Sequence, residues 1–302
     1  MQIPPVGTRV MIRHRLPAGS VPPLTDVIGH LVQTEPTLHV RTKRGDVVAV
    51  AVDEVVVIKA LAAAPVRTAD IRNLEHAAAL AWPGAEQQWV GGWFCRFGHG
   101  ITRRANSAVP LDFSGSSEMG AVADWYAARS VAPLVSAPDR LIRVPADTPT
   151  EAENLVMACD IEPGEPGDAV ALAPRPDEEW MRIYERNVPI DVLTTVVDGS
   201  VIFATVAGAA VARAAVTSAR DGTRWLGLSA LKVAEDQRRR GHARSLCTAL
   251  MGWGADQGAT RAYTQVLADN ASATALFESM GFTLHHRSRY VRIEPVQKGG
   301  GL

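Results

Sequence analysis

The sequence predicts a mixed α/β protein, with a central sheet flanked by helices and a small β-barrel in front of it. Three observations support this fold class. Short strands separated by turns fill Pro4–Leu61, helical and strand patterns alternate from Val66 onward, and a strand over Trp225–Val233 leads through an arginine-rich turn into a helix. We therefore expect a barrel over residues 1–61 and a larger α/β part behind it.

Composition limits the classes of function. The chain has 302 residues, enough for two or three units, and its hydrophobic share of 47% and net charge of −1 are ordinary for a globular protein. We expect no nucleic-acid partner, because there is no basic excess. No apolar run reaches membrane length and the N-terminus lacks the apolar core of a signal peptide, so we expect a cytoplasmic protein without a membrane partner.

Cysteine and histidine form no metal or disulfide pattern. Cys95, Cys159 and Cys247 are far apart and odd in number, which argues against a disulfide framework and against a zinc site. His285 and His286 are adjacent, and on a strand their side chains would face opposite sides of the sheet. We expect no metal site.

The barrel is predicted from five short strand patterns bounded by turn residues. Their ranges are Thr8–Arg13, Asp26–Gln33, Leu38–Thr42, Val47–Val52 and Val55–Lys59. Strands of this number and length suit a small SH3-like barrel. Lys43 and Arg44 lie at a hairpin tip, where we expect their charges to face solvent rather than a nucleic acid.

Residues 66–175 combine helices and strands. The expected helices are Thr68–Ala81, Glu118–Arg129 and Thr148–Cys159, the first with Thr68 in a favourable capping position and the last with Thr148 as its N-cap. The expected strands are a hairpin of Trp89–Phe97 and Ile101–Val109 around Gly98–Gly100, then Pro133–Ser136 and Asp168–Ala173. Thr102–Ser107 either lines a substrate cleft or, as the simpler interpretation, forms a solvated strand edge.

Residues 176–296 alternate helices and strands. The expected helices are Asp177–Asn187, Pro189–Val197, His242–Gln257 and Asn270–Met280. The expected strands are Val201–Ala207, Val211–Thr217, Trp225–Val233, Ala262–Leu267 and Phe282–Ile293. Residues 297–302 are expected to form a disordered tail.

The turn that opens the helix at His242 has the features of a diphosphate site. Its residues are Arg238, Arg239, Arg240, Gly241, His242, Ala243 and Arg244. A helix N-terminus offers unpaired N–H groups and a partial positive charge, and a glycine lets an anion approach them. Arginines add full charges and bidentate donors, so a pyrophosphate fits this turn.

Two motifs in this part of the chain resemble those of the GNAT superfamily of N-acetyltransferases. Arg238, Gly241 and Ala243 match the family's pyrophosphate-binding pattern, which is Arg or Gln, two variable residues, Gly, one variable residue, and Gly or Ala. Asn270–Phe282 matches the family's N-x-x-A-x-x-L-Y/F-x-x-x-G-F helix. The resemblance implies a GNAT fold for residues 176–296.

Residues 66–175 show the same order of elements without the binding motif. Their loop over Asp112–Glu118 carries no arginine. We interpret residues 66–175 as a degenerate, non-binding GNAT-like module, and an unrelated α+β insert is the alternative.

The resemblance implies acetyl-coenzyme A as the acyl donor. In the family's geometry the pyrophosphate lies at residues 238–244, and the pantetheine pairs with backbone groups of Leu231 and Val233 on the open edge of the Trp225–Val233 strand. The thioester lies where this strand separates from Ala262–Leu267. Asn270 either bonds the pantetheine arm, caps its helix, or does both.

The implied reaction is direct attack of a primary amine on the thioester carbonyl. An alkylamine with a pKa near 10.4 is only about one-thousandth neutral at pH 7, so the enzyme must aid its deprotonation. Many family members use a strand glutamate and a helix tyrosine, whereas this chain has Gly227, Gln265 and Phe277 at those positions. We expect proton transfer through water held by Gln265, or through Tyr290 if that side chain turns inward instead of packing.

The prediction for the acceptor depends on charge. Between Glu151 and Glu185 there are ten acidic residues and two arginines, and clustered carboxylates attract cations, although a solvated acidic loop is the usual interpretation. The segment favours a cationic amine, a lysine of a basic protein ahead of a polyamine-like small molecule. The missing glutamate and tyrosine favour the rival hypothesis, a non-catalytic acyl-coenzyme A sensor whose barrel binds a partner.

Overall fold

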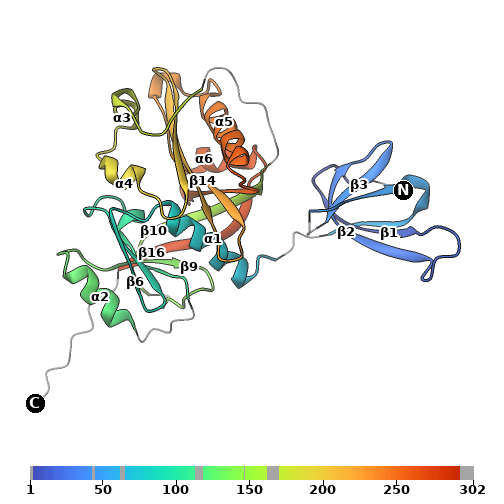
Figure 1. The fold of residues 1–302 in the computed structure, drawn as a ribbon, viewed down its shortest axis with the longest axis horizontal. Helices are drawn as coiled ribbons and strands as arrows, with labels where there is room; N and C mark the ends of the chain where they lie inside the picture. Colours follow the sequence, from blue (N-terminus) through green and yellow to red (C-terminus); the bar gives the residue numbers. More distant parts are fainter. Residues whose placement is uncertain are drawn as a thin grey trace, which may run out of the picture. The chain divides into compact units, whose positions relative to one another are not determined.

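A computed structural model describes residues 3–42, 45–61, 65–112, 118–145, 147–161 and 170–292. The chain divides into two compact units, Met1–Pro65 and Val66–Leu302, and each is described by itself (Figure 1). The predicted hairpin tip at Lys43 and Arg44 and the predicted tail over residues 297–302 lie outside the described residues.

The N-terminal unit is a five-stranded antiparallel sheet in the order β4-β3-β2-β1-β5. Its strands are β1 (Arg9–Arg15), β2 (Leu24–Gln33), β3 (Thr37–Thr42), β4 (Val47–Ala51) and β5 (Val55–Ala60), with a single 3-10 turn η1 (Val52–Glu54) before β5. Alternate side chains enter one core, in which Val10, Ile12, Leu31, Leu38 and Val40 are fully buried. The five predicted strands are confirmed.

The second unit is built around one eight-stranded sheet in the order β11-β12-β13-β14-β15-β10-β16-β9. Its strands are β9 (Leu134–Pro138), β10 (Thr150–Asp160), β11 (Ala171–Ala173), β12 (Ser200–Val206), β13 (Ala210–Ser218), β14 (Arg224–Val233), β15 (Arg261–Leu267) and β16 (Thr283–Arg292). β14 and β15 pair in parallel, and the other neighbours pair antiparallel. The predicted mixed sheet is confirmed.

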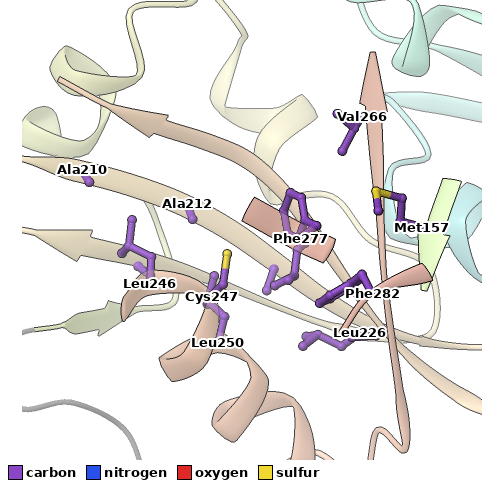
Figure 2. Close-up of a cluster of buried hydrophobic side chains, with 14 of the residues drawn as sticks. Met157, Ala210, Ala212, Leu226, Leu246, Cys247, Leu250, Val266, Phe277 and Phe282 are labelled. Atoms are coloured by element: carbon purple, nitrogen blue, oxygen red, sulfur yellow. The ribbon is translucent and has the colours of Figure 1, made fainter. Parts of the chain in front are cut away.

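Helices cover both faces of this sheet. They are α1 (Thr68–Ala81), α2 (Met119–Ala127), α3 (Glu178–Tyr184), α4 (Ile190–Thr194), α5 (His242–Asp256) and α6 (Ala271–Glu278), with 3-10 turns η2 (Arg104–Asn106) and η4 (Glu235–Gln237). On one face Leu246 and Leu250 of α5 pack against Ala212 and Leu226 (Figure 2). On the opposite face α1 packs on β13 and β14, and Figure 1 shows α3 and α4 on the other side of β14 from α5.

The segment Thr148–Cys159 is a strand, so the predicted helix there is wrong. β10 pairs with β15 from Asn154 to Asp160 and with β16 from Thr150 to Ala158. Both faces of the strand are buried, because Val156 enters the α1 core and Met157 enters the α5 core. An apolar run that is buried on both sides has the same composition as a helix segment, and here the two neighbouring strands decide.

Residues 66–175 and 176–296 contribute to one sheet. β9 and β10 belong to the first segment and flank β16 of the second, and residues Val66–Leu302 form one compact unit. Whether residues 66–175 are a degenerate GNAT-like module stays a prediction.

The hairpin predicted around Gly98–Gly100 turns at another place. β6 (Glu86–Val90) and β7 (Trp93–Phe97) pair Val90 with Trp93, and only the short β8 (Val109–Pro110) follows on the other side of β7. Asn106 explains the difference. Its buried side chain accepts hydrogen bonds from the backbone N–H groups of Gly98 and Gly100 and donates to the carbonyl groups of Ile101 and Thr102, which organises a loop instead of a strand.

The remaining helices and strands lie where the sequence placed them, with shifted ends. α1 begins at Thr68, but its cap is Arg67, whose N–H donates to the Asp70 carboxylate at 3.0 Å. α3 ends at Tyr184 because Glu185 adopts a left-handed conformation with φ of 56°. No helix among the described residues is long and apolar enough to cross a bilayer.

Candidate active site

The two parallel strands at the centre of the sheet separate halfway along their length. β14 pairs with β15 only from Trp225 to Leu228. Beyond that point the register with β13 shifts and Ala230 has a φ of +53°, a bulge that bends β14 away. β15 stays paired with β10 as far as Leu267. Among the described residues, the β15 side of residues 229–233 therefore has no strand partner.

A cleft of about 340 Å³ opens between the separated strands, within the usual size range of small-molecule sites. It brings together five residues that the sequence singled out, namely Leu231, Gln265, Asn270, Phe277 and Tyr290. Gln265 on β15 lies opposite Val156 of β10, and Tyr290 on β16 lies opposite Ala152 of the same strand. The structure therefore places both predicted catalytic side chains at one cleft.

The predicted diphosphate turn lies past the end of β14 and begins α5. Gly241 is the N-cap of α5 with a φ of +86°, and no side chain caps the first turn. A Cβ at this glycine would meet nothing within 4 Å, and Arg239 also adopts a left-handed conformation, with a φ of +65°. The first amides of α5, at His242 and Ala243, are therefore accessible to an anion.

The four arginines of the turn do not behave alike. Arg238, Arg239 and Arg240 are exposed, and Arg238 lies 3.6 Å from the Glu235 carboxylate. Arg244 points to the end of α6 instead, where it donates to the Ser279 hydroxyl at 2.6 Å. Arg239 and Arg240 can thus turn toward a bound diphosphate, and Arg238 can do so by leaving Glu235.

The predicted residues on α6 have structural roles as well. Asn270 is the N-cap of α6 and accepts a hydrogen bond from the Ala273 N–H at 3.1 Å, so the capping interpretation is confirmed, and its contact with pantetheine stays a prediction. Phe277 packs edge-on against Phe282 at a centroid distance of 5.2 Å (Figure 2). Its ring is buried and offers no proton donor to the cleft.

Tyr263 occupies the space beside Gly227. A Cβ on Gly227 would collide with the Tyr263 phenol, so the tyrosine ring fills the position that a larger residue at 227 would take. Burial raises the pKa of Tyr263, which keeps its hydroxyl protonated as a donor. Local sequence does not single out Tyr263, because its position opposite Gly227 depends on the register of β14 and β15.

A buried arginine lines a small recess beside the cleft, on the α1 side, which shares Trp82, Arg104 and Gln265 with it. Arg213 is 1% exposed and donates to the carbonyl groups of Leu193 at 2.6 Å, Ala81 at 2.9 Å and Thr195 at 3.4 Å. Burial lowers its pKa to about 9. A lone arginine inside the apolar strand Ala210–Ser218 was a signal that the sequence analysis did not use.

Three further cleft residues come from segments that the sequence analysis placed elsewhere. Asn154 lies on β10, which was expected to be a helix, Arg104 comes from the misplaced hairpin, and Trp82 is the C-cap of α1, to which the sequence analysis assigned no site role. Thr102 and Arg103 also line the cleft. The interpretation of Thr102–Ser107 as a solvated strand edge is therefore wrong, and the cleft-lining alternative holds for its first three residues.

The acidic segment is largely neutralised by neighbouring cations. Glu151 pairs with Arg103 and Arg292, and Glu185 lies 2.7 Å from Lys232. The further pairs are Glu153 with Arg287, Asp160 with Arg261, and Glu179 with Arg182. Glu162, Glu165 and Asp168 lie outside the described residues. Five of the seven described acidic residues of this segment are therefore in ion pairs, and Asp177 caps α3 by accepting a hydrogen bond from the Trp180 N–H.

The adjacent histidines on β16 do not face opposite sides. The register of β10 and β16 shifts so that His285 is an extra residue between the pairs Met157–Leu284 and Val156–His286, and this bulge brings the two Nδ1 atoms to 2.8 Å. His286 Nε2 lies 2.8 Å from the Glu75 carboxylate of α1. Among the described residues, no group of three or more histidine, cysteine or acidic side chains is arranged to hold a metal ion.

Two family models match the chain. Residues 68–291 match the model described as "Probable histone acetyltransferase Rv0428c C-terminal", and residues 4–59 match the model described as "Rv0428c N-terminal Sm-like domain". A curated relative, the probable histone acetyltransferase Rv0428c of Mycobacterium tuberculosis, is 48% identical over 295 residues, which cover 97% of each chain. An uncharacterized N-acetyltransferase of Bacillus subtilis, YobR, is 24% identical over 71% of this chain and 95% of its own.

Solved structures resemble the fold. A GCN5-related N-acetyltransferase from Kribbella flavida matches with a TM-score of 0.53 at 14% identity, over 76% of this chain and 96% of its own. A putative acetyltransferase of the GNAT family from Novosphingobium aromaticivorans matches with a TM-score of 0.52 at 17% identity, over 73% and 97% of the two chains.

Proposed function

Because this chain belongs to the family of the probable histone acetyltransferase Rv0428c and is an N-acetyltransferase of the GNAT type, we propose that it transfers the acetyl group of acetyl-coenzyme A to a primary amine. The observation that carries this proposal is the separation of β14 from β15 beyond Leu228. The separation leaves an unpaired strand edge on one side of a cleft, and the same strand leads to the open N-terminus of α5.

Acetyl-coenzyme A would extend from the N-terminus of α5, along the free edge of β14, to the cleft. The diphosphate would accept hydrogen bonds from the amides of Gly241, His242 and Ala243, with Arg238, Arg239 and Arg240 beside it. The pantetheine would extend along the free edge of β14, where backbone groups of Leu231 and Val233 are available for strand-like hydrogen bonds.

The acetyl end of the donor would reach the cleft itself. Asn270 and Phe277 line the cleft on the α6 side, and they would contact the arm as it passes. The thioester would then lie where β14 and β15 meet, near Leu228 and Gln265.

The acceptor would be a lysine side chain, with a small-molecule amine as the second candidate. The lysine is supported by the name of the relative at 48% identity, a probable histone acetyltransferase. The acidic segment adds little support for a lysine in a basic protein, because most of its described carboxylates are engaged in ion pairs. Either acceptor would attack the thioester carbonyl with a neutral nitrogen, form the amide bond and release the thiol.

The proton of the amine would leave through the polar side chains of the cleft. Among the described residues, no carboxylate lines the cleft, so a direct carboxylate base is not available there. Water held by Gln265 and by backbone carbonyl groups would accept the proton, or the Tyr290 hydroxyl would pass it on.

The test is acetyl transfer by the purified full chain. The chain is incubated with acetyl-coenzyme A and a panel of amines, and free thiol and acetylated product are measured together. We expect thiol release that depends on the amine and equals the amount of product. If acetyl-coenzyme A binds but no amine releases thiol above the rate without amine, the protein is an acyl-coenzyme A sensor and the proposed reaction is wrong.

A further inference from the structure

The charged side chains that line the cleft are all cationic within the part of the chain that the structure describes. They are Arg103, Arg104, Arg186 and Lys232. Arg103 and Lys232 have carboxylate partners, Glu151 at 3.2 Å and Glu185 at 2.7 Å. Arg104 and Arg186 have no carboxylate within 4 Å among the described residues, so the cleft carries uncompensated positive charge.

Arg104 is the less solvated of these two arginines. Its Nε is buried and has no hydrogen-bond partner among the described residues, and its guanidinium lies over the Trp82 ring at 5.4 Å from the centroid. Arg213 lies over the same ring at 4.4 Å. Two guanidinium groups therefore share one indole at the α1 side of the cleft, where little water screens them.

No carboxylate compensates Arg213 either. Its guanidinium has backbone carbonyl groups and the Ser229 hydroxyl as partners, and among the described residues no acid lies within 4 Å. A charge taken out of water is costly unless a counter-charge is near. The recess that Arg213 and Arg104 line beside the cleft therefore favours a bound anion and disfavours a second cation.

The diphosphate of acetyl-coenzyme A is not the anion that would bind beside Arg104 and Arg213. Its proposed site, at Gly241 and the N-terminus of α5, follows the far end of β14. Arg104, Trp82 and Arg213 lie where β14 and β15 are still close, in a small recess with Gly227 and Gln265. That recess is on the α1 side of the sheet, and α5 packs on the opposite side.

We propose that the acceptor carries a carboxylate or a phosphate close to its reactive amine, and that Arg104, assisted by Arg186, binds this acidic group. The inference rests on the proposed acetyl transfer. An anchored acid fixes the distance of the amine from the thioester. The same cations lower the pKa of the incoming ammonium group, because like charge disfavours the protonated form. The cleft thereby contributes to the deprotonation for which it has no carboxylate base.

Two kinds of acceptor carry an acidic group close to an amine. They are a small amino acid and a peptide lysine with an acidic neighbour. The experiment therefore measures kcat/KM of the full chain for matched acceptors with and without the acid. The small-molecule pairs are L-lysine against cadaverine and O-phosphoethanolamine against ethanolamine. The peptide arm uses capped pentapeptides in which glutamate, phosphoserine, alanine or arginine flanks a central lysine.

We expect the acid-bearing member of at least one arm to react about tenfold faster or more, as for a charge-assisted, bidentate contact. Arg104→Gln should lower the ratio of kcat/KM between acid-bearing and acid-free acceptors to about threefold or less. Arg104→Lys keeps the positive charge but loses the bidentate guanidinium, so it should retain part of this preference. Arg182→Gln is the matched control, because Arg182 is exposed and pairs with Glu179 away from the cleft. Affinity for acetyl-coenzyme A should stay the same in all three variants.

The outcomes separate this inference from the function on which it rests. A parent that shows no preference for the acid-bearing acceptors in either arm refutes the inference and leaves the transferase intact. A preference that survives Arg104→Gln in a folded protein refutes the assignment of Arg104. Acetyl-coenzyme A binding without transfer to any acceptor refutes the proposed function, and the inference falls with it.

Discussion

The two sides of the cleft are assembled in different ways. The proposed donor side comes from one continuous stretch, in which β14, the arginine turn, α5, β15 and α6 follow each other between Trp225 and Glu278. The acceptor side is assembled from residues far apart in the sequence, such as Trp82, Arg104, Asn154 and Tyr290. One side is therefore determined by local sequence, and the other depends on the way the sheet is completed.

Because the two sides of the cleft are assembled differently, we expect single substitutions to have different effects on each side. A strand followed by a glycine turn and a helix produces open amides wherever it folds, because the geometry is local. The acceptor side requires β10 between β15 and β16 and the loop that Asn106 holds. We expect point changes on the donor side to act on cofactor affinity, and changes on the acceptor side to act on stability or turnover.

The largest expected effect is on the donor side, at Gly241. Gly241→Asp places a carboxylate where the diphosphate would bind, and its Cβ has open space, so the fold should survive. We expect the affinity for acetyl-coenzyme A to fall about a thousandfold, equal to about 4 kcal/mol. Isothermal titration with acetyl-coenzyme A measures this loss.

Two controls separate charge from backbone strain at Gly241. Gly241→Asn has the same left-handed conformation without the charge, and we expect a smaller loss of affinity. Gly222→Asp repeats the strain at another open glycine, with a φ of +82° in the turn before β14, and should leave the affinity unchanged. If folded Gly241→Asp binds as tightly as the parent, the turn is not the diphosphate site.

Arg213 tests whether the acceptor side depends on long-range contacts. Arg213→Met removes the donor for carbonyl groups on α1, on α4 and just after α4. We expect the free energy of unfolding to fall by roughly 3 kcal/mol, since buried acceptors are left without donors, while the affinity for acetyl-coenzyme A stays within about threefold of the parent. Urea unfolding measures the first effect.

Arg182→Met is the matched control for Arg213, because the Arg182 side chain is exposed. Its stability should change by less than about 0.5 kcal/mol. A stable Arg213→Met protein would show that the cost of burying this guanidinium equals the gain from its hydrogen bonds, and the acceptor side would then not depend on them.

Tyr290 tests the proton path on the acceptor side. Its side chain is 6% exposed and lines the cleft, so Tyr290→Phe removes the hydroxyl and preserves most of the packing. We expect kcat to fall about tenfold with no change in acetyl-coenzyme A affinity. The measurement is turnover from pH 6 to 9, and full turnover over that range would assign Tyr290 to packing and leave the proton path to water and Gln265.

The sequence predicted the local structure of the proposed donor side well and that of the proposed acceptor side poorly, for physical reasons. Gly241 and Asn270 have their conformations set within a few residues, so the turn and the capped helix were confirmed as local structure. Thr148–Cys159 was predicted as a helix with Thr148 as its cap, and only pairing with β15 and β16 makes residues 150–160 a strand. Asn154 was missed together with that strand.

Other errors had the same origin. The charges of the segment between Glu151 and Glu185 suggested a cation-attracting surface, but partners such as Arg103, Arg287 and Lys232 come from other parts of the chain. Tyr263 was not singled out, because only the register between β14 and β15 places its phenol beside Gly227. A short stretch of sequence shows neither which distant residue will pair with a charged side chain nor how two strands will align in a sheet.

The last expected effect is similar in size to that of Tyr290→Phe and concerns the paired histidines of β16, one of which contacts Glu75 of α1. Burial, followed by the neighbouring His286, lowers the pKa of His285 to about 3. Arg261 and Arg140 act in the same direction, Asp70 opposes them, and His286 is held by Glu75. Folded His285 therefore stays neutral between pH 6.5 and 3, whereas the unfolded chain takes up a proton below its ordinary pKa of about 6.5.

Stability must fall as the pH drops through this range, because the unfolded state binds more protons. From pH 6.5 to 5.0 we expect His285 to account for a loss of about 1.5 kcal/mol in the free energy of unfolding. His285→Gln should remove this part of the slope, and urea unfolding of parent and variant at pH 7.5, 6.5 and 5.0 measures the difference. Parallel slopes would mean that the unfolded and folded chains protonate His285 alike, and that the bulge on β16 leaves the ring open to water.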